Sequence, residues 1–344
     1  MPVEMFTTLE GIWFLLAGVF LVGYALTDGF DLGSGILTIF TKKDENRKVL
    51  YNAVAPVWDG NEVWLIAGGG MLFAAFPIVY AASFSGFYLA ILIVLWALIG
   101  RAVAFEYRNK KESPVWRKSW DWIYWLGNIV PAFLFGVAVG NAVIGVPIDQ
   151  QGVYHGSFFT LLRPAPVLMG VVSVFMFLMH GSAYLLRKTE GEVFNLAKRS
   201  AYISLFGYVA ALVLTDFLLV LTAPFLYENY FKYPLFWIAP LMIFTGLILF
   251  FRFLTSGKFN KVIIGSTLTT IGTVLTIAFA SYPVLMRSTI NPEFNLTIWN
   301  SASSHITLTV MLVVTVLLMP IVIFYTAYVY RVFKGKVSAE GGYH

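Results

Sequence analysis

The stretch GYALTDGFDLGSGILTIF, residues 23–40, holds two aspartates, Asp28 and Asp31, among apolar residues, glycines and small hydroxyl residues. It is the second half of an apolar segment, 9–40, that is long enough to cross a bilayer. A carboxyl group inside such a helix costs free energy unless it faces a partner, a cavity or a proton path. The stretch therefore predicts a spanning helix with an acidic face that has a structural or functional role.

The composition of the whole chain agrees with a membrane location. Of 344 residues, 59% are hydrophobic and 12% are charged, whereas soluble domains carry roughly a quarter charged residues. Cysteine is absent from the sequence, which excludes disulfides, thiolate metal sites and thiol nucleophiles. These features are typical of a polytopic membrane protein with little mass outside the bilayer.

Hydropathy divides the chain into nine candidate spanning helices, each apolar over roughly 20 residues or more. We expect an all-α polytopic membrane protein, with residues 1–344 forming a single integral membrane domain. Its architecture is expected to be two four-helix bundles plus one peripheral helix. The predicted helices cover residues 9–40, 50–77, 79–107, 119–145, 164–187, 200–223, 235–254, 261–286 and 306–331.

The basic residues predict the orientation of these helices. Nineteen of the 23 Lys and Arg residues lie in the loops after the first, third, fifth and seventh helices and in the C-terminal tail. Cytoplasmic loops carry such an excess, so we expect the N-terminus outside and the C-terminus in the cytoplasm. The net charge of +5 then reflects topology, and no nucleic-acid partner is expected.

Four carboxyl groups are predicted to meet between the first two helices. Asp28 and Asp31 precede Phe40 by twelve and nine residues, and Asp59 and Glu62 follow Leu50 by nine and twelve. Each pair would lie about 14–18 Å along its helix from the cytoplasmic end. The i, i+3 spacing places both members of a pair on one helix face. We therefore expect a four-carboxyl cluster that could transfer protons.

The acids also fit two roles other than proton transfer in an enzyme. Arg101, at similar depth on the third helix, could neutralise one of them, in which case the acids would be structural. A proton-coupled secondary transporter would also suit buried acids and glycine-rich helices. Glycines such as Gly29 and Gly33, spaced as G-x-x-x-G, favour close helix packing.

The histidines do not favour a haem or metal site in this chain. His155 and His305 lie near outer helix ends, His180 lies inside the fifth helix, and His344 ends the sequence. H-E-x-x-H and Glu-x-x-His motifs are absent from the sequence. We therefore expect that this chain binds no cofactor and no metal of its own.

Three stretches carry a resemblance to a known family. GYALTDGFDLGSGIL, APVWDGNEVWLIAGGGMLFAAFP and LIGRAVAFEYR begin at residues 23, 55 and 98. They are similar to subunit II of the cytochrome bd-type quinol oxidases. The T-D-G-F-D-L-G and W-D-G-N-E-V-W motifs are long and specific, and the nine-helix layout resembles that family over the whole chain.

The resemblance implies a function in a bacterial cell membrane. Subunit II of that family pairs with subunit I, which carries two b-type haems, a d-type haem and the quinol site. The complex oxidises quinol and reduces oxygen to water in the respiratory chain. A small single-helix third subunit, and a lipid or quinone bound to this chain, are left open by the sequence.

The resemblance also assigns roles to individual residues. Asp28 and Asp59 become candidates for a proton route from the cytoplasm, with Asp31 and Glu62 as neighbours. Trp58 and Arg101 become candidates to face the haem region across the subunit boundary. Catalytic residues are expected in the partner subunit and not in this chain.

Overall fold

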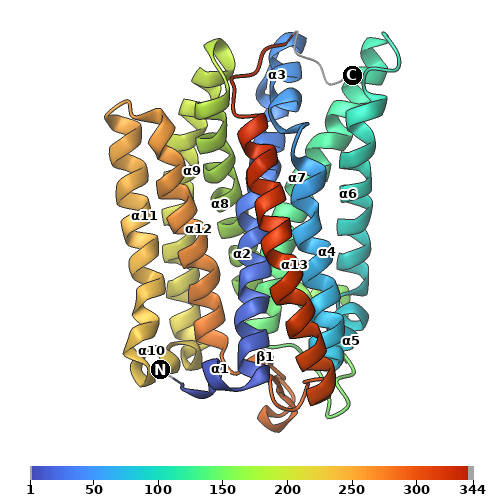
Figure 1. The fold of residues 1–344 in the computed structure, drawn as a ribbon, viewed down its shortest axis with the longest axis vertical. Coiled ribbons are helices and arrows are strands. Elements are labelled where there is room, and N and C mark those ends of the chain that lie inside the picture. Colours follow the sequence, from blue (N-terminus) through green and yellow to red (C-terminus); the bar gives the residue numbers. More distant parts are fainter. Residues whose placement is uncertain (1, 340–344) are drawn as a thin grey trace.

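The computed structural model describes residues 2–339, and nearly all regular structure in this range is helical. The long helices run side by side along the longest axis of the molecule (Figure 1). The α-helices are α1 Glu4–Thr7, α2 Leu9–Ile36, α3 Asp44–Val54, α4 Trp58–Ala75, α5 Pro77–Gly86, α6 Tyr88–Tyr107, α7 Pro114–Ile144, α8 Pro164–Lys188, α9 Gly191–Thr222, α10 Glu228–Lys232, α11 Ile238–Thr255, α12 Phe259–Ser281 and α13 His305–Val332.

Short elements connect the long helices. Strands β1 Val284–Met286 and β2 Leu296–Thr297 form an antiparallel pair. The 3₁₀ helices are η1 Leu37–Phe40, η2 Phe158–Leu161, η3 Pro224–Tyr227, η4 Pro234–Trp237 and η5 Pro292–Phe294.

The number of spanning helices agrees with the prediction of an all-α polytopic membrane protein. Within residues 2–339, eight helices are long and apolar enough to cross a membrane, and a ninth span is obtained if α4 and α5 count as one. These two helices bend by 119° at their junction. Pro77 takes the first position of α5, where its missing N–H is tolerated, although it cannot continue α4.

The predicted helices 50–77 and 79–107 have different boundaries in the structure. Residues 44–54 form the separate helix α3, and α4 begins only at Trp58. Pro56 lies in the turn between them and offers no N–H to a continuous helix. Residues 79–107 divide at Phe87 between α5 and α6. The prediction of one continuous helix over each range was therefore wrong.

Two further boundaries are corrected. The predicted helix 261–286 ends at Ser281, because proline disfavours helical geometry in the residue before it and Pro283 follows Tyr282. The predicted helix 200–223 begins nine residues earlier, at Gly191. Residues 191–199, which were predicted to lie in a basic loop, are therefore helical. Only Thr189 and Glu190 separate α8 from α9.

Helix α2 lies at the centre of the packing and contacts α4, α7, α8 and α12. Its closest approach is to α8, where a methyl group placed on Gly33 would lie 1.9 Å from the carbonyl oxygen of Phe177. Gly181 of α8 faces the same point. A residue without Cβ is required here, which confirms the close packing predicted for Gly33.

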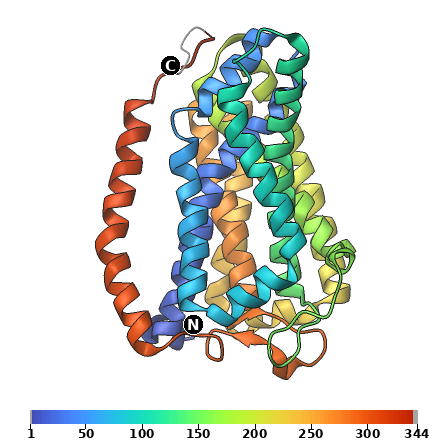
Figure 2. The ribbon, with the colours of Figure 1, turned by 90° about the vertical axis from the view of Figure 1, so that its right-hand side faces the viewer.

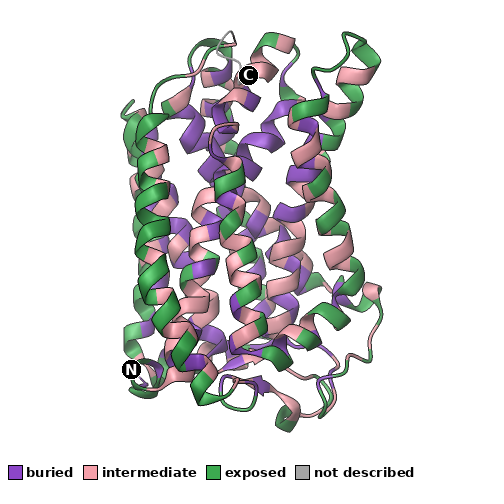
Figure 3. Cartoon of the chain, turned by 45° about the vertical axis from the view of Figure 1, so that its right-hand side comes forward, coloured by how far each residue is buried: buried purple, intermediate pink, exposed green. Residues whose placement is uncertain are grey.

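Helix α13 stands apart from the other long helices (Figure 2). Hydrogen bonds hold it near both ends: Trp13 Nε1 donates to the carbonyl of Leu308 over 3.1 Å, and the Tyr330 hydroxyl donates to Asn61 over 2.7 Å. Buried residues concentrate in the centre of the molecule, while outward helix faces are exposed (Figure 3). The division into two four-helix bundles stays a prediction.

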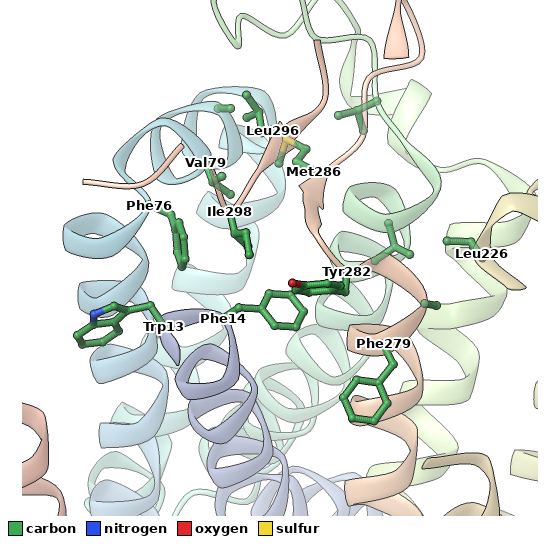
Figure 4. Packing of buried hydrophobic residues seen from close by; sticks show 14 of the residues in the cluster. Trp13, Phe14, Phe76, Val79, Leu226, Phe279, Tyr282, Met286, Leu296 and Ile298 are labelled. Carbon is green, nitrogen blue, oxygen red and sulfur yellow. The ribbon is translucent and has the colours of Figure 1, made fainter. Parts of the chain in front are cut away.

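The two ends of the molecule differ in chemistry. We call the end that carries α3 and the connections 108–113, 189–190 and 256–258 the basic end. At the opposite end, aromatic and aliphatic side chains from several elements pack together (Figure 4). Phe14 meets the ring of Tyr282 edge-on, with centroids 5.3 Å apart. Which end faces the cytoplasm stays a prediction.

Candidate functional site

Arg101 of α6 joins two of the predicted carboxyl groups. Its guanidinium donates to both oxygens of Asp28, over 2.5 and 3.2 Å, and to Oε1 of Glu62 over 2.5 Å. Arg101 and Asp28 are almost fully buried, with 1% and 0% of their side chains exposed, whereas Glu62 is 21% exposed. One positive charge therefore faces two carboxylates, and this trio has a net charge of −1 when both are ionised.

Asp31 has a different partner, one helical turn along α2 from Asp28. Its Oδ2 accepts a hydrogen bond of 2.7 Å from Asn61 Nδ2, and Asn61 Oδ1 accepts one of 2.7 Å from the hydroxyl of Tyr330. Asp31 Oδ1 is buried, and among the described residues it has no hydrogen-bond partner. Asp31 is thus a buried carboxyl group held by an amide and not by a cation.

Asp59 lies outside this buried cluster. It occupies the second position of α4 and is exposed, without an ion pair to any residue in the range 2–339. The count from Leu50 assumed one helix where the chain forms α3, a turn and α4, so the depth of Asp59 in the membrane stays a prediction. Its neighbour Trp58 is half-buried and stacks on Phe105 with ring centroids 5.0 Å apart.

A groove connects Asp59 with the surface at the basic end. Its volume is about 1360 Å³, and it lies between the start of α4, the end of α6 and the last turns of α13. Asp59, Asn61 and Tyr330 all line it. The hydrogen-bonded chain from Tyr330 through Asn61 to Asp31 therefore begins at the wall of an opening that is large enough to hold water.

The structure brings together part of the predicted cluster. Asp28 and Glu62 meet at Arg101, Asp31 lies beside them on α2, and Asp59 remains in the groove. Arg101 is buried within this chain, so Glu62 is the member of the trio that reaches the surface.

Sequence reasoning missed two residues of the site. Asn61 stands inside the W-D-G-N-E motif, and its amide between two acids was an available signal. Tyr330 lies 269 residues further along the chain, and no local pattern connects it with Asn61.

Two of the histidines have hydrogen-bond or ion-pair partners among the described residues. His180 is buried, and both ring nitrogens have partners: Ser266 Oγ at 2.9 Å and the carbonyl of Leu26 at 3.0 Å. His155 is paired with Asp149 in an exposed loop. His305 begins α13, and His344 lies outside the described residues. Within the described part of the chain, no group of three His, Cys, Asp or Glu side chains could hold a metal ion.

Comparison with protein families gives a match over nearly the whole chain. The family model described as cytochrome bd terminal oxidase subunit II matches residues 9–333. The probable cytochrome oxidase subunit 2 of Haemophilus influenzae is 38% identical, with 96% of each chain covered. The cytochrome bd-I ubiquinol oxidase subunit 2 of Escherichia coli K12 is 37% identical, with 97% of each chain covered.

More distant relatives extend the similarity. The cytochrome bd ubiquinol oxidase subunit 2 of Bacillus subtilis is 34% identical, over 96% of this chain and 97% of the relative. Among solved structures, a chain of the bd oxidase from Geobacillus thermodenitrificans superposes with a TM-score of 0.79, over 95% of this chain and 99% of that chain. At 17% sequence identity, this last similarity supports the fold alone.

Proposed function

The chain belongs to the family of cytochrome bd terminal oxidase subunit II, and we propose that it carries protons from the cytoplasm towards a haem-bearing partner subunit. As a member of that family it is a subunit of a quinol oxidase, a multi-pass membrane protein of the respiratory chain. Beyond this family membership, the proposal names the direction of proton transfer and the residues that carry it out.

The observation that carries the proposal is the connection between the groove and the buried acids. Asp59 lines the groove, Asn61 and Tyr330 form its wall, and Asn61 donates to Asp31 over 2.7 Å. Asp28 follows at i−3 on the same face of α2, and Arg101 joins it to Glu62. A proton that enters at Asp59 would need water to carry it past Asn61, whose amide orients Asp31 but does not relay protons, and it would then meet the carboxyl groups of Asp31 and Asp28.

The charges of the described groups suit proton transfer. Asp31 can accept a proton on its unpaired Oδ1 without breaking an ion pair. The trio of Asp28, Arg101 and Glu62 has a charge of −1 when ionised, and a buried net charge is costly. One proton taken up by the trio would make it neutral, and the partly exposed Glu62 could then release that proton outside this chain.

The basic end supports the direction of transport. It carries most of the lysines and arginines in the connections between helices, as cytoplasmic loops do. The groove opens at this end, so we propose that protons enter from the cytoplasm and that the C-terminus also lies there. The bacterial cell membrane is the corresponding location.

The cofactors are proposed to belong to the partner. The hydrogen bonds on both nitrogens of His180 support a haem-free chain, with b- and d-type haems and the quinol site in subunit I. Trp58 is proposed to lie near the subunit boundary. When this chain is purified without its partner, we expect no stoichiometric haem. One haem per chain that is lost in His180→Ala would overturn this assignment.

The proton route is tested by Asp59→Asn and by the double variant Asp28→Asn, Asp59→Asn in the purified complex. Asparagine keeps the shape of the side chain but cannot ionise. We expect quinol oxidation to fall at least tenfold in the double variant, with haem content unchanged, since positioned proton-transfer groups contribute about 10²–10⁴-fold.

The matched control is Glu45→Gln, which removes an exposed carboxyl group of α3 at the same end of the molecule. It should retain the full rate. If Asp59→Asn instead removes the protein from the membrane, the carboxylate is structural. A full rate in the double variant would refute the route.

A further inference from the structure

The C-terminal end of α13 carries Tyr330 but has little side-chain packing to hold it in place. Within residues 305–332, Leu308 alone is buried, and it lies in the first turn of the helix, far from the basic end. The helix packs chiefly on α2 and α4 among the described elements. The last turns of α13 therefore depend on specific hydrogen bonds for their position.

One ammonium group at the end of α8 supplies such bonds. Lys188 is the last residue of α8, and its Nζ donates to the carbonyl oxygen of Phe333 and, over 3.3 Å, to that of Gly335. Both carbonyls follow the last turn of α13, where backbone oxygens lack partners inside the helix. The helix dipole also favours a positive charge at this end. Lys188 thus caps α13 from a neighbouring helix.

The backbone of Lys188 holds the chain that follows α13. Its carbonyl accepts a hydrogen bond of 2.9 Å from the amide of Val337. One residue further, the carbonyl of Ser338 accepts a hydrogen bond of 3.2 Å from Asn52 of α3. Residues 333–339, which we call the strap, cross the basic end from α13 past the turn between α8 and α9 to α3 (Figure 1).

A second ion pair of the strap is expected to contribute less. Lys336 Nζ lies 2.5 Å from Glu190 Oε1, but the two side chains are 57% and 72% exposed. Exposed ion pairs contribute little because water and salt screen them. Hydrogen bonds from a charged donor contribute more, and Lys188 is only partly exposed. Lys188 is therefore the main anchor of the strap.

A row of aromatic rings connects the anchor with the proposed route. Lys188 Nζ lies 5.8 Å from the centre of the Tyr184 ring, and Tyr184 stacks on Phe30 with centroids 4.0 Å apart. Phe30 meets the ring of Tyr330 edge-on at 6.1 Å. The carbonyls that Lys188 holds begin one helical turn after Tyr330. The anchor thus keeps the Tyr330 ring beside Phe30, with its hydroxyl on Asn61.

We propose that Lys188 is a positioning residue of the proton route. It fixes the last turn of α13, so that the Tyr330 hydroxyl stays on Asn61 and the Asn61 amide stays oriented towards Asp31. This inference rests on the proposed function, because the orientation of Asn61 affects turnover only if Asp31 takes part in proton transfer. Among the described residues Lys188 forms no ion pair with an acid, so it acts through Tyr330.

The attachment is tested by hydrogen–deuterium exchange in the purified complex. Lys188→Met keeps an unbranched side chain but has no N–H to donate. Amide exchange in the strap should rise about threefold or more, because the charged donor that holds it is lost. Lys188→Arg retains donors and should stay within about twofold of the unmodified complex. The matched control Arg187→Gln removes an exposed charge from the preceding position and should also leave exchange unchanged.

The positioning role is tested by quinol oxidation and proton uptake in the same variants. Lys188→Met should slow both several-fold with unchanged haem content, whereas Lys188→Arg and Arg187→Gln should keep the full rate. The double variant Lys188→Met, Tyr330→Phe should be no slower than Tyr330→Phe alone, because residues that act through one contact are not additive. Val337→Pro, which removes the N–H bonded to the Lys188 carbonyl, should change exchange and rate in the same direction.

Four results would overturn the inference. Equal exchange in Lys188→Met and Arg187→Gln would show that only the charge of this end matters. Additive losses in the double variant would show that Lys188 acts elsewhere than through Tyr330. A full rate in Lys188→Met, with a slow Asp28→Asn, Asp59→Asn variant, would refute the positioning role and leave the proposed function standing. A full rate in that double acid variant would refute both.

Discussion

The two halves of α2 are stabilised by different interactions. Towards the opposite end, Trp13 and Phe14 pack in an apolar cluster that includes Tyr282 and side chains of many other elements. Towards the basic end, Asp28 and Asp31 are buried and depend on Arg101 and Asn61. Apolar packing tolerates changes of shape and volume, but a buried charge needs its specific partner. The comparison predicts that loss of the Arg101 charge affects both assembly and turnover, that loss of a carboxylate in the second half lowers turnover, and that substitutions in the first half affect stability alone.

The largest loss of assembled complex is expected from Arg101→Gln. This change leaves the buried Asp28 and the partly exposed Glu62 without a counter-charge, and removal of one partner of a buried ion pair costs about 3–5 kcal/mol. We expect little assembled complex in the membrane. Addition of Asp28→Asn and Glu62→Gln to the same chain should restore assembly, measured as the amount of purified complex, but not turnover. Failure of the triple variant to assemble better than Arg101→Gln would contradict the account.

A smaller loss of stability is expected from a substitution where α2 packs against α8. Gly33→Ala forces a methyl group against the backbone of Phe177, and overpacking of this kind costs about 1–3 kcal/mol. A methyl group placed on Gly18 of the same helix would meet no atom within 4 Å. Gly18→Ala should therefore be neutral or slightly stabilising. The thermal unfolding temperature of the purified complex measures the effect of each variant. Equal shifts of this temperature in Gly33→Ala and Gly18→Ala would refute the close contact between Gly33 and Phe177.

In the apolar half, Phe14→Leu should lower stability by about 1 kcal/mol, because an aromatic pair contributes roughly that much beyond buried area. Quinol oxidation per haem should not change, since Phe14 contacts none of the acids. A loss of turnover larger than the loss of assembled complex would show that the two halves of α2 are coupled.

A similarly small loss of stability is expected for Tyr330→Phe. This change removes one hydrogen bond to Asn61, which contributes about 0.5–1.5 kcal/mol. We nevertheless expect turnover to fall several-fold, because Asn61 then loses the partner that orients it towards Asp31. Tyr328→Phe, an exposed change half a turn away on the same helix, is the control and should leave the rate unchanged.

Much of the fold was predictable from hydropathy, and the exceptions have local causes. Long apolar runs define spanning helices because a bilayer requires about 20 apolar residues. The predicted break at residue 77 coincides with Pro77, the first residue of α5. The breaks at Pro56 and Pro283 depend on where a proline interrupts the helical backbone, and a hydropathy window averages over such points. The amphipathic helix α3 was therefore joined to α4 in the prediction.

The candidate site was predictable only in part. The spacing of Asp28 and Asp31 placed them on one face, and Glu62 and Arg101 do meet Asp28 in the structure. The depth of Asp59 depended on a helix boundary that the sequence did not resolve. Tyr330 joins the site only because α13 returns alongside α4, and a contact between such distant residues has no local signal.

The central claim is tested most directly by Asp31→Asn in the complex reconstituted into vesicles. Asp31 has no cationic partner in the described part of the chain, so its neutralisation leaves the Asp28–Arg101–Glu62 trio intact and separates proton transfer from charge pairing. Proton uptake from the cytoplasmic side and quinol oxidation are measured together. The account predicts that both rates fall at least tenfold with unchanged haem content. Unchanged proton uptake at the full rate of quinol oxidation would contradict it.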